Sequence, residues 1–414
     1  MLDQRLSGRW LRVGGLGSLA LAIAGLTAGC GSSGSGTTAK LPAGLSGGQA
    51  SAFVSAQFSA EDRAAQTKSS PQPGSFLDGK RTVSVVSSTT PANGDVNPYA
   101  IWPVTETIGA VSAGDVLVDN FNNKSNEQGT GTTIVDIHAG GRQTVFAHLP
   151  HKLAGCPGGV GLTTAMVQLR AGGWVIVGSL PSQNGKTATA APGCLIVLTA
   201  NGKLAKTIAA PYIDGPWDAT VKDDGDTATL FVANTLIGIH GDGLPGAKQG
   251  DVIRLTLSQS ATAAPTVTAH TVVADQLPER GDASSFIKGP TGLQLGASGA
   301  LYVADDLDNS VIAVPNALRR ARPTAGMTLS SGGQLANPLG IATAPNGDLL
   351  VANATNGKIV EVTPAGKQVG EFYAIPNVGQ DPPGNGDLFG LAIDRSKAGL
   401  LLVDDADNTL ELLH

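Results

Sequence analysis

The chain has 414 residues and a formal net charge of −6, and 14% of its residues are charged and 4% aromatic. This acidic balance provides no positive field for a nucleic acid, so we expect no nucleic-acid partner. With 56 glycines and few charges, the composition is typical of turn-rich β structure with a surface of small polar residues.

The N-terminus carries the pattern of an export signal that ends in a lipidation site. Three arginines precede an apolar run at 13–26, which is short for a membrane span. Leu26-Thr27-Ala28-Gly29-Cys30 then resembles a bacterial lipobox, in which cleavage before Cys30 leaves that residue acylated and anchored. We therefore expect residues 1–29 to be a lipoprotein signal peptide and the exported protein to be held on a bacterial membrane. In a bacterium with two membranes, Gly31 favours sorting to the outer membrane; in a bacterium with one membrane, we expect the protein on the outer face of the cell membrane. The alternative is that the N-terminus is an ordinary cleaved signal or an uncleaved anchor.

Residues 30–80 are expected to be a lipid-anchored, flexible tether. The stretch 31–38 contains only Gly, Ser and Thr, the composition of a flexible coil. The stretch 50–68 could form a short helix, but its apolar content is too low for a domain. A β-rich run, Thr82-Val83-Ser84-Val85-Val86, follows the tether.

Six times after this run, a short apolar strand ends in Val and continues into a small polar turn. The valines lie 48 to 71 residues apart, at Val118, Val177, Val232, Val303, Val351 and Val403. Each is preceded by a turn and a strand and followed by a third strand, and a fourth strand usually comes after a Gly-containing turn. Such a recurrence marks a repeat architecture. Four strands in each of six units predict an all-β fold, a six-bladed β-propeller over residues 81–414.

The sixth unit has only three strands before His414. An open blade would expose unpaired backbone groups at its edge. We therefore predict that the strand at 82–86 pairs with the strand at 410–413 and closes the ring. The alternative is an edge strand that packs elsewhere.

Units four to six carry a family resemblance. Gly289-Pro290-Thr291-Gly292-Leu293, continuing to Ile312, and Asn337-Pro338-Leu339-Gly340-Ile341, continuing to Ile359, resemble NHL-repeat propellers and, more loosely, gluconolactonase-like propellers. The resemblance is good over 284–414 and weaker over 97–257. It implies the architecture but not the activity, because propellers host binding proteins, lyases and hydrolases alike.

Cys156 and Cys194 are the cysteines that remain after Cys30, and they bracket the second unit. In an exported protein such a pair favours a disulfide. Two free buried thiols are the alternative.

Acidic turns occupy the same position in units four and six. They contain Asp305 and Asp308, and Asp405 and Asp407. Asp side chains commonly cap their own turns, which is the first interpretation. The alternative is a site for Ca²⁺ or another divalent cation, because closely spaced carboxylates are ligands for hard cations. We expect no other cofactor.

The blade-opening turns could form a binding site at one propeller face. Trp102 and Trp217 follow Pro98 and Pro216 in units one and three, and Asp218 is adjacent. Tryptophan is enriched at recognition hot spots, so we predict that Trp102, Trp217, Asp218 and Asn337 contribute to ligand binding. The alternative is that either indole fills the gap between neighbouring blades.

The function is expected to be that of a monomeric, non-catalytic binding or scaffolding module in the cell envelope, with a protein, glycan or small molecule as partner. No catalytic triad is recognisable, and His138, His148 and His151 are interpreted as solvated loop histidines, with metal ligation as the alternative. The alternative function is a metal-dependent lactonase or hydrolase. It follows from the gluconolactonase-like resemblance, whose acidic-Gly-Pro-aromatic opening is loosely matched by Asp214-Gly215-Pro216-Trp217.

Overall fold

The computed structural model describes residues 74–237, 248–396 and 398–414. The predicted signal peptide, Cys30 and most of the predicted tether lie outside the described residues. The described part of the chain contains strands β1 to β26 and one short 3₁₀ helix, η1 (Thr187–Thr189), but no α-helix. Accordingly, no helix among these residues is long and apolar enough to cross a membrane. The all-β prediction is confirmed.

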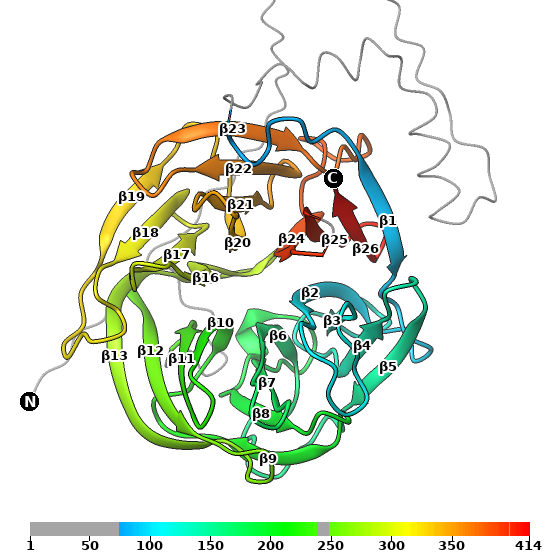
Figure 1. Ribbon diagram of the computed structural model, residues 1–414, viewed down its shortest axis with the longest axis vertical. Helices are drawn as coiled ribbons and strands as arrows, with labels where there is room; N and C mark the ends of the chain where they lie inside the picture. The colour runs from blue at the N-terminus through cyan, green and yellow to red at the C-terminus, as the bar shows by residue number, and fades with distance from the viewer. Residues whose placement is uncertain (1–73, 238–247, 397) are drawn as a thin grey trace, which may run out of the picture. The chain divides into compact units, whose positions relative to one another are not determined.

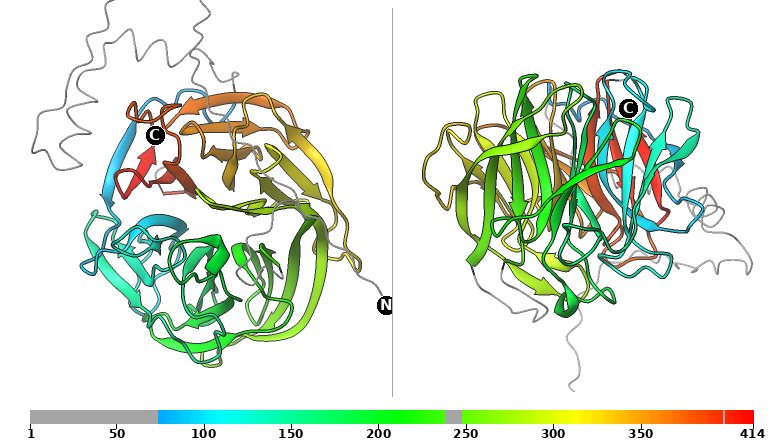
Figure 2. Two further views of the ribbon diagram at one scale, coloured as in Figure 1. Left: turned by 180° about the vertical axis from the view of Figure 1, so that it is seen from behind. Right: turned by 90° about the horizontal axis from the view of Figure 1, so that it is seen from below.

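The strands form six four-stranded antiparallel sheets arranged as blades in a ring (Figure 1; Figure 2). From the inner strand outward, blade one contains β2 (Val96–Pro103), β3 (Val116–Asn122), β4 (Thr133–Ile137) and β5 (Gln143–His148). Blade two contains β6 (Leu162–Gln168), β7 (Val175–Ser179), β8 (Cys194–Leu198) and β9 (Leu204–Ile208). Blade three contains β10 (Pro216–Asp223), β11 (Thr227–Asn234), β12 (Lys248–Ser258) and β13 (Thr266–Pro278). A hairpin, β14 (Arg280–Asp282) and β15 (Phe286–Lys288), follows blade three.

Blades four to six repeat the same order. Blade four contains β16 (Pro290–Leu295), β17 (Leu301–Asp305), β18 (Ser310–Val314) and β19 (Met327–Ser331). Blade five contains β20 (Pro338–Thr343), β21 (Leu349–Asn353), β22 (Lys358–Val362) and β23 (Gln368–Tyr373). Blade six contains β24 (Leu388–Asp394), β25 (Gly399–Asp404), β26 (Thr409–Leu413) and, as its outer strand, β1 (Val83–Ser88). The predicted six-bladed propeller is therefore confirmed.

The N-terminal strand closes the ring as predicted. β1 pairs antiparallel with β26, from Val83 opposite Leu413 to Ser88 opposite Thr409. The segment that leads into β1 is also fixed, because the carboxylate of Glu361 in blade five accepts the backbone N–H groups of Phe76 and Leu77 at 2.7 and 2.9 Å. The N-terminal segment thus joins blade five to blade six.

The core lies between neighbouring blades. The second strand of a blade is covered on both faces by the adjacent blades, so β7, β17 and β21 are buried at every residue. Such strands need no polar face, which explains their continuous runs of apolar residues ending in the small polar turn. This packing accounts for the recurrence that predicts the fold.

Asparagines at the turns hold successive blades together. The Asn309 side-chain oxygen accepts the backbone N–H of Asn337 at 2.6 Å, and the Asn408 oxygen accepts that of Asn97 at 2.7 Å. All four residues have positive φ, between 49° and 62°. Asparagine tolerates this left-handed backbone better than other residues with side chains, and its amide can reach the next blade.

The acidic turns use their carboxylates locally. Asp305 Oδ1 accepts the backbone N–H groups of Leu307 and Asp308, each at 3.1 Å, and Asp404 Oδ1 accepts those of Ala406 and Asp407. These are the contacts expected of turn caps. Cation binding by Asp305, Asp308, Asp405 and Asp407 stays a prediction.

Blade two carries the predicted disulfide. Cys156 and Cys194 are bonded, with Cα atoms 5.3 Å apart across 38 residues. Both are buried. The bond ties the loop before β6 to the start of β8.

Removing this disulfide should destabilise the fold. Closing a loop of this length contributes ~3–4 kcal/mol in the chain-entropy account. We expect the double variant Cys156→Ser/Cys194→Ser to lose about that much unfolding free energy in chemical denaturation. Reducing the wild type should produce a similar loss, and reductant should leave the variant unchanged. Equal stability of oxidised and reduced wild type would contradict the expectation.

Candidate functional site: the central channel

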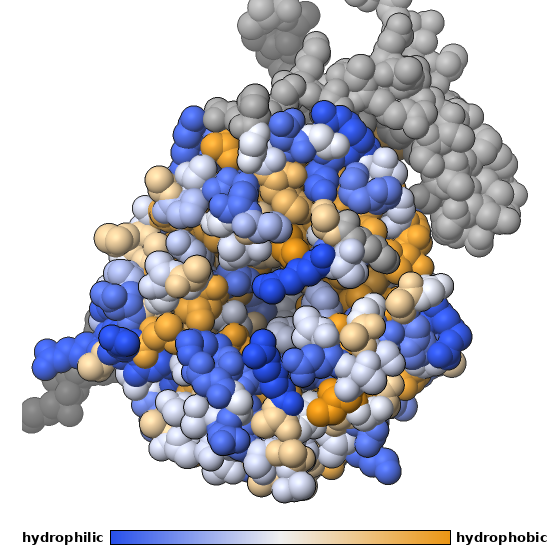
Figure 3. All heavy atoms as spheres, viewed as in Figure 1, coloured by the Kyte–Doolittle hydropathy of each residue, from blue (hydrophilic) through white to orange (hydrophobic). Residues whose placement is uncertain are grey.

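The inner strands of all six blades line one central channel with a cavity volume of about 1530 Å³. Figure 3 shows the ring hollowed near its centre, where strongly hydrophilic and hydrophobic residues lie side by side. The lining extends onto the turns that follow the inner strands, so the channel opens at that end. Its wall is largely apolar and includes Ile101, Met166, Val221, Leu293, Ile341 and Leu391.

The other end of the channel has an aromatic floor. Tyr99 lies 5.6 Å from Trp217 and 4.7 Å from Phe389, measured between ring centroids. Beneath them, Phe121 contacts Phe286 of the β14–β15 hairpin at 5.6 Å. Phe286 is fully buried and has a φ of 68°. A bulky residue is rarely found there, which indicates that the hairpin is held in this conformation by its packing.

The structure separates the two tryptophans that the sequence places together. Trp217 is 1% exposed and packs in the floor, where it borders the cavity. Ligand binding by Trp217 stays a prediction. Trp102 lies near the far end of β2 and lines the channel. Asn337 uses its side chain within the fold: its amide donates to Asp306 O at 2.9 Å, and its oxygen accepts the Thr355 hydroxyl.

Asp218 is the acidic residue placed on the channel wall next to the floor. Its Oδ2 accepts the backbone N–H of Leu293 from the next blade at 2.6 Å, and its Oδ1 accepts that of Ala219 at 2.8 Å. Burial raises the pKa of Asp218 to about 8, although these hydrogen bonds act in the opposite direction and the charge of Asp119 adds to the increase. The carboxyl is therefore largely protonated at neutral pH and can exchange a proton near that pH.

Asp119 is a second buried carboxyl close to the floor. Its Oδ1 accepts the N–H of Ala100 at 2.9 Å, and its Oδ2 has no hydrogen-bond partner. Burial raises the pKa of Asp119 to about 8 as well. The environment of the channel floor thus disfavours the charged form of both carboxyls.

These pKa values predict that stability falls as the pH rises. A carboxyl whose pKa is raised on folding binds more protons in the folded than in the unfolded state between the two pKa values. For Asp119 and Asp218 that window runs from the ordinary value of 3.8 to about 8. We expect a higher melting temperature at pH 5.5 than at pH 9, with a smaller difference in Asp218→Asn. A melting temperature that increases across this range would contradict the expectation.

A pair of acidic residues lies at the other face. Asp387 and Asp405 line a separate cavity of about 420 Å³ between blades six and one. Burial and the charge of Asp387 raise the pKa of Asp405 to about 7. Of the four predicted cation ligands, Asp405 lines this second cavity, and none lines the central channel.

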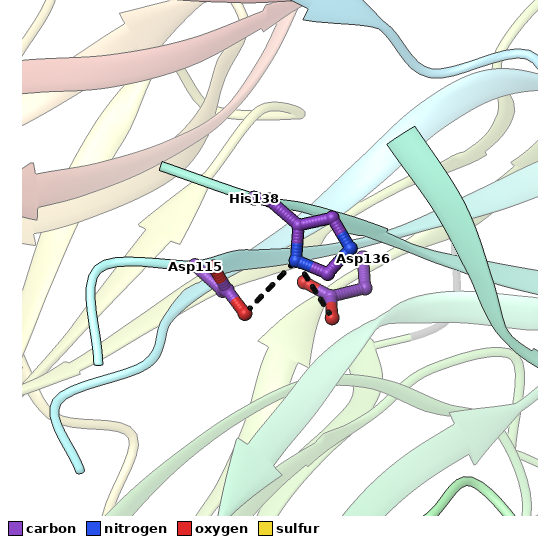
Figure 4. Close-up of side chains that lie close together, drawn as sticks. All are labelled: Asp115, Asp136 and His138. Atoms are coloured by element: carbon purple, nitrogen blue, oxygen red, sulfur yellow. Dashed lines mark hydrogen bonds and ion pairs between the residues drawn. The ribbon is translucent and has the colours of Figure 1, made fainter. Parts of the chain in front are cut away.

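A cluster of three titratable residues lies at the rim of the channel in blade one (Figure 4). His138 Nδ1 is 3.2 Å from Asp115 Oδ2 and 3.7 Å from Asp136 Oδ2. Asp115 precedes β3 and also lines the channel, Asp136 is in β4, and His138 follows it. Among the described residues, this is the only group of three His, Cys, Asp or Glu residues whose donor atoms all lie within 4.8 Å.

Sequence reasoning finds only one member of this cluster. In the sequence His138 is close to His148 and His151, but in the structure these two histidines are exposed and lie outside the cluster. The partners of His138 are brought to it by the pairing of β3 with β4, in which Leu117 faces Asp136. The Asp136-Ile137-His138 spacing at a strand end could have indicated one carboxylate, but nothing local identifies Asp115.

Comparison with known proteins supports the fold. No protein-family model matches the chain, and no curated protein resembles it in sequence. Among solved structures, a protein named as a candidate gluconolactonase matches with a TM-score of 0.51 at 13% identity, covering 84% of this chain and 97% of the other. This chain therefore shares its β-propeller fold with that structure. A gluconolactonase from Xanthomonas campestris matches with a TM-score of 0.50 at 12% identity over 80% of this chain and 88% of its own length. A luciferin-regenerating enzyme matches with a TM-score of 0.50 at 11% identity, covering 80% and 94%.

Proposed function

We propose that this gluconolactonase-like propeller binds a small organic molecule in its central channel and hydrolyses a lactone or related ester, with Asp218 as the general acid–base. This is the alternative that the sequence left open. The observation that carries the proposal is the position of Asp218: a carboxyl fixed by two backbone N–H groups on the wall of a large cavity. The likeness to gluconolactonases and a luciferin-regenerating enzyme adds support from the fold.

The chemistry follows from the protonation state of Asp218. At neutral pH its neutral carboxyl can donate a proton to the ring oxygen of a lactone as water adds to the carbonyl carbon and the ring C–O bond breaks. The proton lost by the attacking water restores the carboxyl. Such proton transfer typically contributes ~10²–10⁴-fold to the rate. The apolar wall favours lactones with hydrophobic substituents over strongly hydrated sugars.

A metal on the propeller axis is not part of this proposal. The alternative function considered from the sequence, a metal-dependent lactonase or hydrolase, includes such a metal. Three or more convergent donor atoms are needed to hold a metal ion. Asp218 and Asp119 supply two carboxyls near the floor, and within the described ranges they belong to no set of three His, Cys, Asp or Glu donors. Both oxygens of Asp218 already accept backbone N–H groups. We therefore assign no step to an axial metal.

A panel of alkyl- and aryl-substituted five- and six-membered lactones tests the function. We expect the purified chain to hydrolyse at least one class of them, with or without a chelator, and Asp218→Asn to lose ~10²-fold or more in kcat/KM. Glu106→Gln is the matched control, because Glu106 is an exposed carboxyl at the channel mouth. Binding without turnover would favour the non-catalytic module, and equal rates in wild type and Asp218→Asn would remove Asp218 from the mechanism.

We further propose that the propeller is displayed on a bacterial membrane through lipidated Cys30. The lipobox-like sequence and the Gly/Ser/Thr-rich stretch after it support this proposal. We expect Cys30→Ser to leave the membrane fraction or to accumulate as unprocessed precursor. Normal processing and membrane partitioning of the variant would contradict lipidation at this residue.

A further inference from the structure

Asp136 presents an electrostatic problem. It is 3% exposed, its Oδ1 has no hydrogen-bond partner, and its Oδ2 lies 3.7 Å from His138 Nδ1, too far for a hydrogen bond. Burying a carboxylate without hydrogen bonds or a close counter-charge is unfavourable. Arg142 attracts the carboxylate at longer range, but it forms no ion pair with Asp136 in the described structure. The Asp136 carboxylate is therefore buried without any hydrogen bond in the described structure.

A proton on His138 Nδ1 forms a hydrogen bond with only one of the two carboxylates. The imidazole Nδ1 is at hydrogen-bond distance from Asp115 Oδ2, 3.2 Å, so an Nδ1–H group would donate to Asp115 and give Asp136 an ion pair at 3.7 Å without a hydrogen bond. The donor atoms are instead spaced for one shared ion. Neighbouring ligands held ~2.0–2.2 Å from a metal lie ~2.8–3.6 Å apart in octahedral or tetrahedral geometry, close to the observed 3.2 and 3.7 Å.

The surroundings orient the three side chains. Asp115 Oδ2 accepts the backbone N–H of Ser112 at 2.8 Å, and its Oδ1 accepts that of Ala139 at 3.3 Å. On the far side of the imidazole, His138 Nε2 lies 3.0 Å from the Thr144 hydroxyl. Contacts of this kind fix the ring and carboxylate orientation around metal ions. Figure 4 shows both carboxylates pointing toward the Nδ1 side of the ring.

We propose that Asp115, Asp136 and His138 bind one divalent transition-metal ion, of the Zn²⁺ or Mn²⁺ kind. One imidazole nitrogen and two carboxylate oxygens are the donors that suit these ions better than Ca²⁺. Three protein ligands leave a coordination position for water or for a ligand. Because Asp115 also lines the channel, the ion lies at the channel rim. The site uses none of the residues proposed for lactone hydrolysis, so either proposal can fail alone.

Metal binding to the full chain tests the site directly. The protein is stripped with EDTA, dialysed, and titrated with ZnCl₂ and MnCl₂ by calorimetry and by thermal shift. We expect one ion per chain for at least one of the metals and a melting temperature that rises with metal concentration. Asp136→Asn and His138→Gln should each weaken binding by ~100-fold or more, whereas the matched control His148→Gln, an exposed residue on β5, should bind like wild type.

The metal-free proteins give an independent readout that does not depend on a variant losing its fold. Asp136→Asn removes a buried charge that has no hydrogen bond, so we expect the metal-free variant to melt at or above the wild-type temperature at pH 8, while only the wild type gains stability from metal. Stoichiometric binding that persists in both Asp136→Asn and His138→Gln would overturn the proposal. So would the absence of binding of both metals to folded wild type.

Discussion

Deleting residues 81–90 should lower the melting temperature by ~10 °C or more, since a loss of several kcal/mol has an effect of this size in a large domain. The deletion removes β1, whose pairing with β26 runs from Val83–Leu413 to Ser88–Thr409. It also removes Thr89, which is fully buried and donates to Asn408 O from both its backbone and its side chain. The edge of β26 would be left unpaired and the ring open.

Val85→Thr is the control for that deletion. Val85 is 64% exposed on β1, so the substitution retains the backbone pairing and leaves the apolar core unchanged. We expect a change of less than ~0.5 kcal/mol. A melting curve that is the same for the deletion and for wild type would show that β1 does not close the propeller.

Phe286→Ala should destabilise the protein by ~3–5 kcal/mol, the range for truncating a buried aromatic side chain. Phe286 is fully buried, with ring centroids 5.6 Å from Phe121 and 6.3 Å from Trp217. Without the ring, the channel floor loses the residue that supports it from the hairpin side. Chemical denaturation provides the measurement.

Two further variants show whether the loss of stability in Phe286→Ala comes from the missing ring. Ile287→Val, at a buried neighbour, should cost only ~0.5–1.5 kcal/mol. Phe286→Gly removes the same ring but is relaxed at the positive φ of 68°, so it should be no less stable than Phe286→Ala. A loss below ~1 kcal/mol in Phe286→Ala would mean that the hairpin does not support the floor.

The blade count, the closing strand and the disulfide can all be predicted from the sequence because each leaves a local or periodic signal. The second strand of each blade is buried on both faces, which produces the apolar runs that end at residues such as Val303 and Val351. The three-strand sixth unit requires an edge partner. Cys156 precedes the first strand of the second unit and Cys194 opens its third strand.

The site is less predictable because it depends on side-chain direction and strand register. Trp217 and Asp218 are consecutive in β10, at a register irregularity between Pro216 and Asp218. Trp217 packs into the floor, whereas Asp218 accepts the backbone N–H of Leu293 on the wall. The sequence groups them as two members of one blade-opening surface. The Asp115–Asp136–His138 cluster depends on the register between β3 and β4. The support of the channel floor comes from the β14–β15 hairpin, which is not part of the repeating unit.

The pH dependence of kcat/KM for the best lactone substrate tests the role of Asp218 in the channel most directly. A general acid with a pKa of about 8 should give a wild-type profile that falls as the pH rises through that value. The residual activity of Asp218→Asn should lack this limb, while Glu106→Gln should retain it. A limb near pH 8 that persists unchanged in Asp218→Asn would contradict the account.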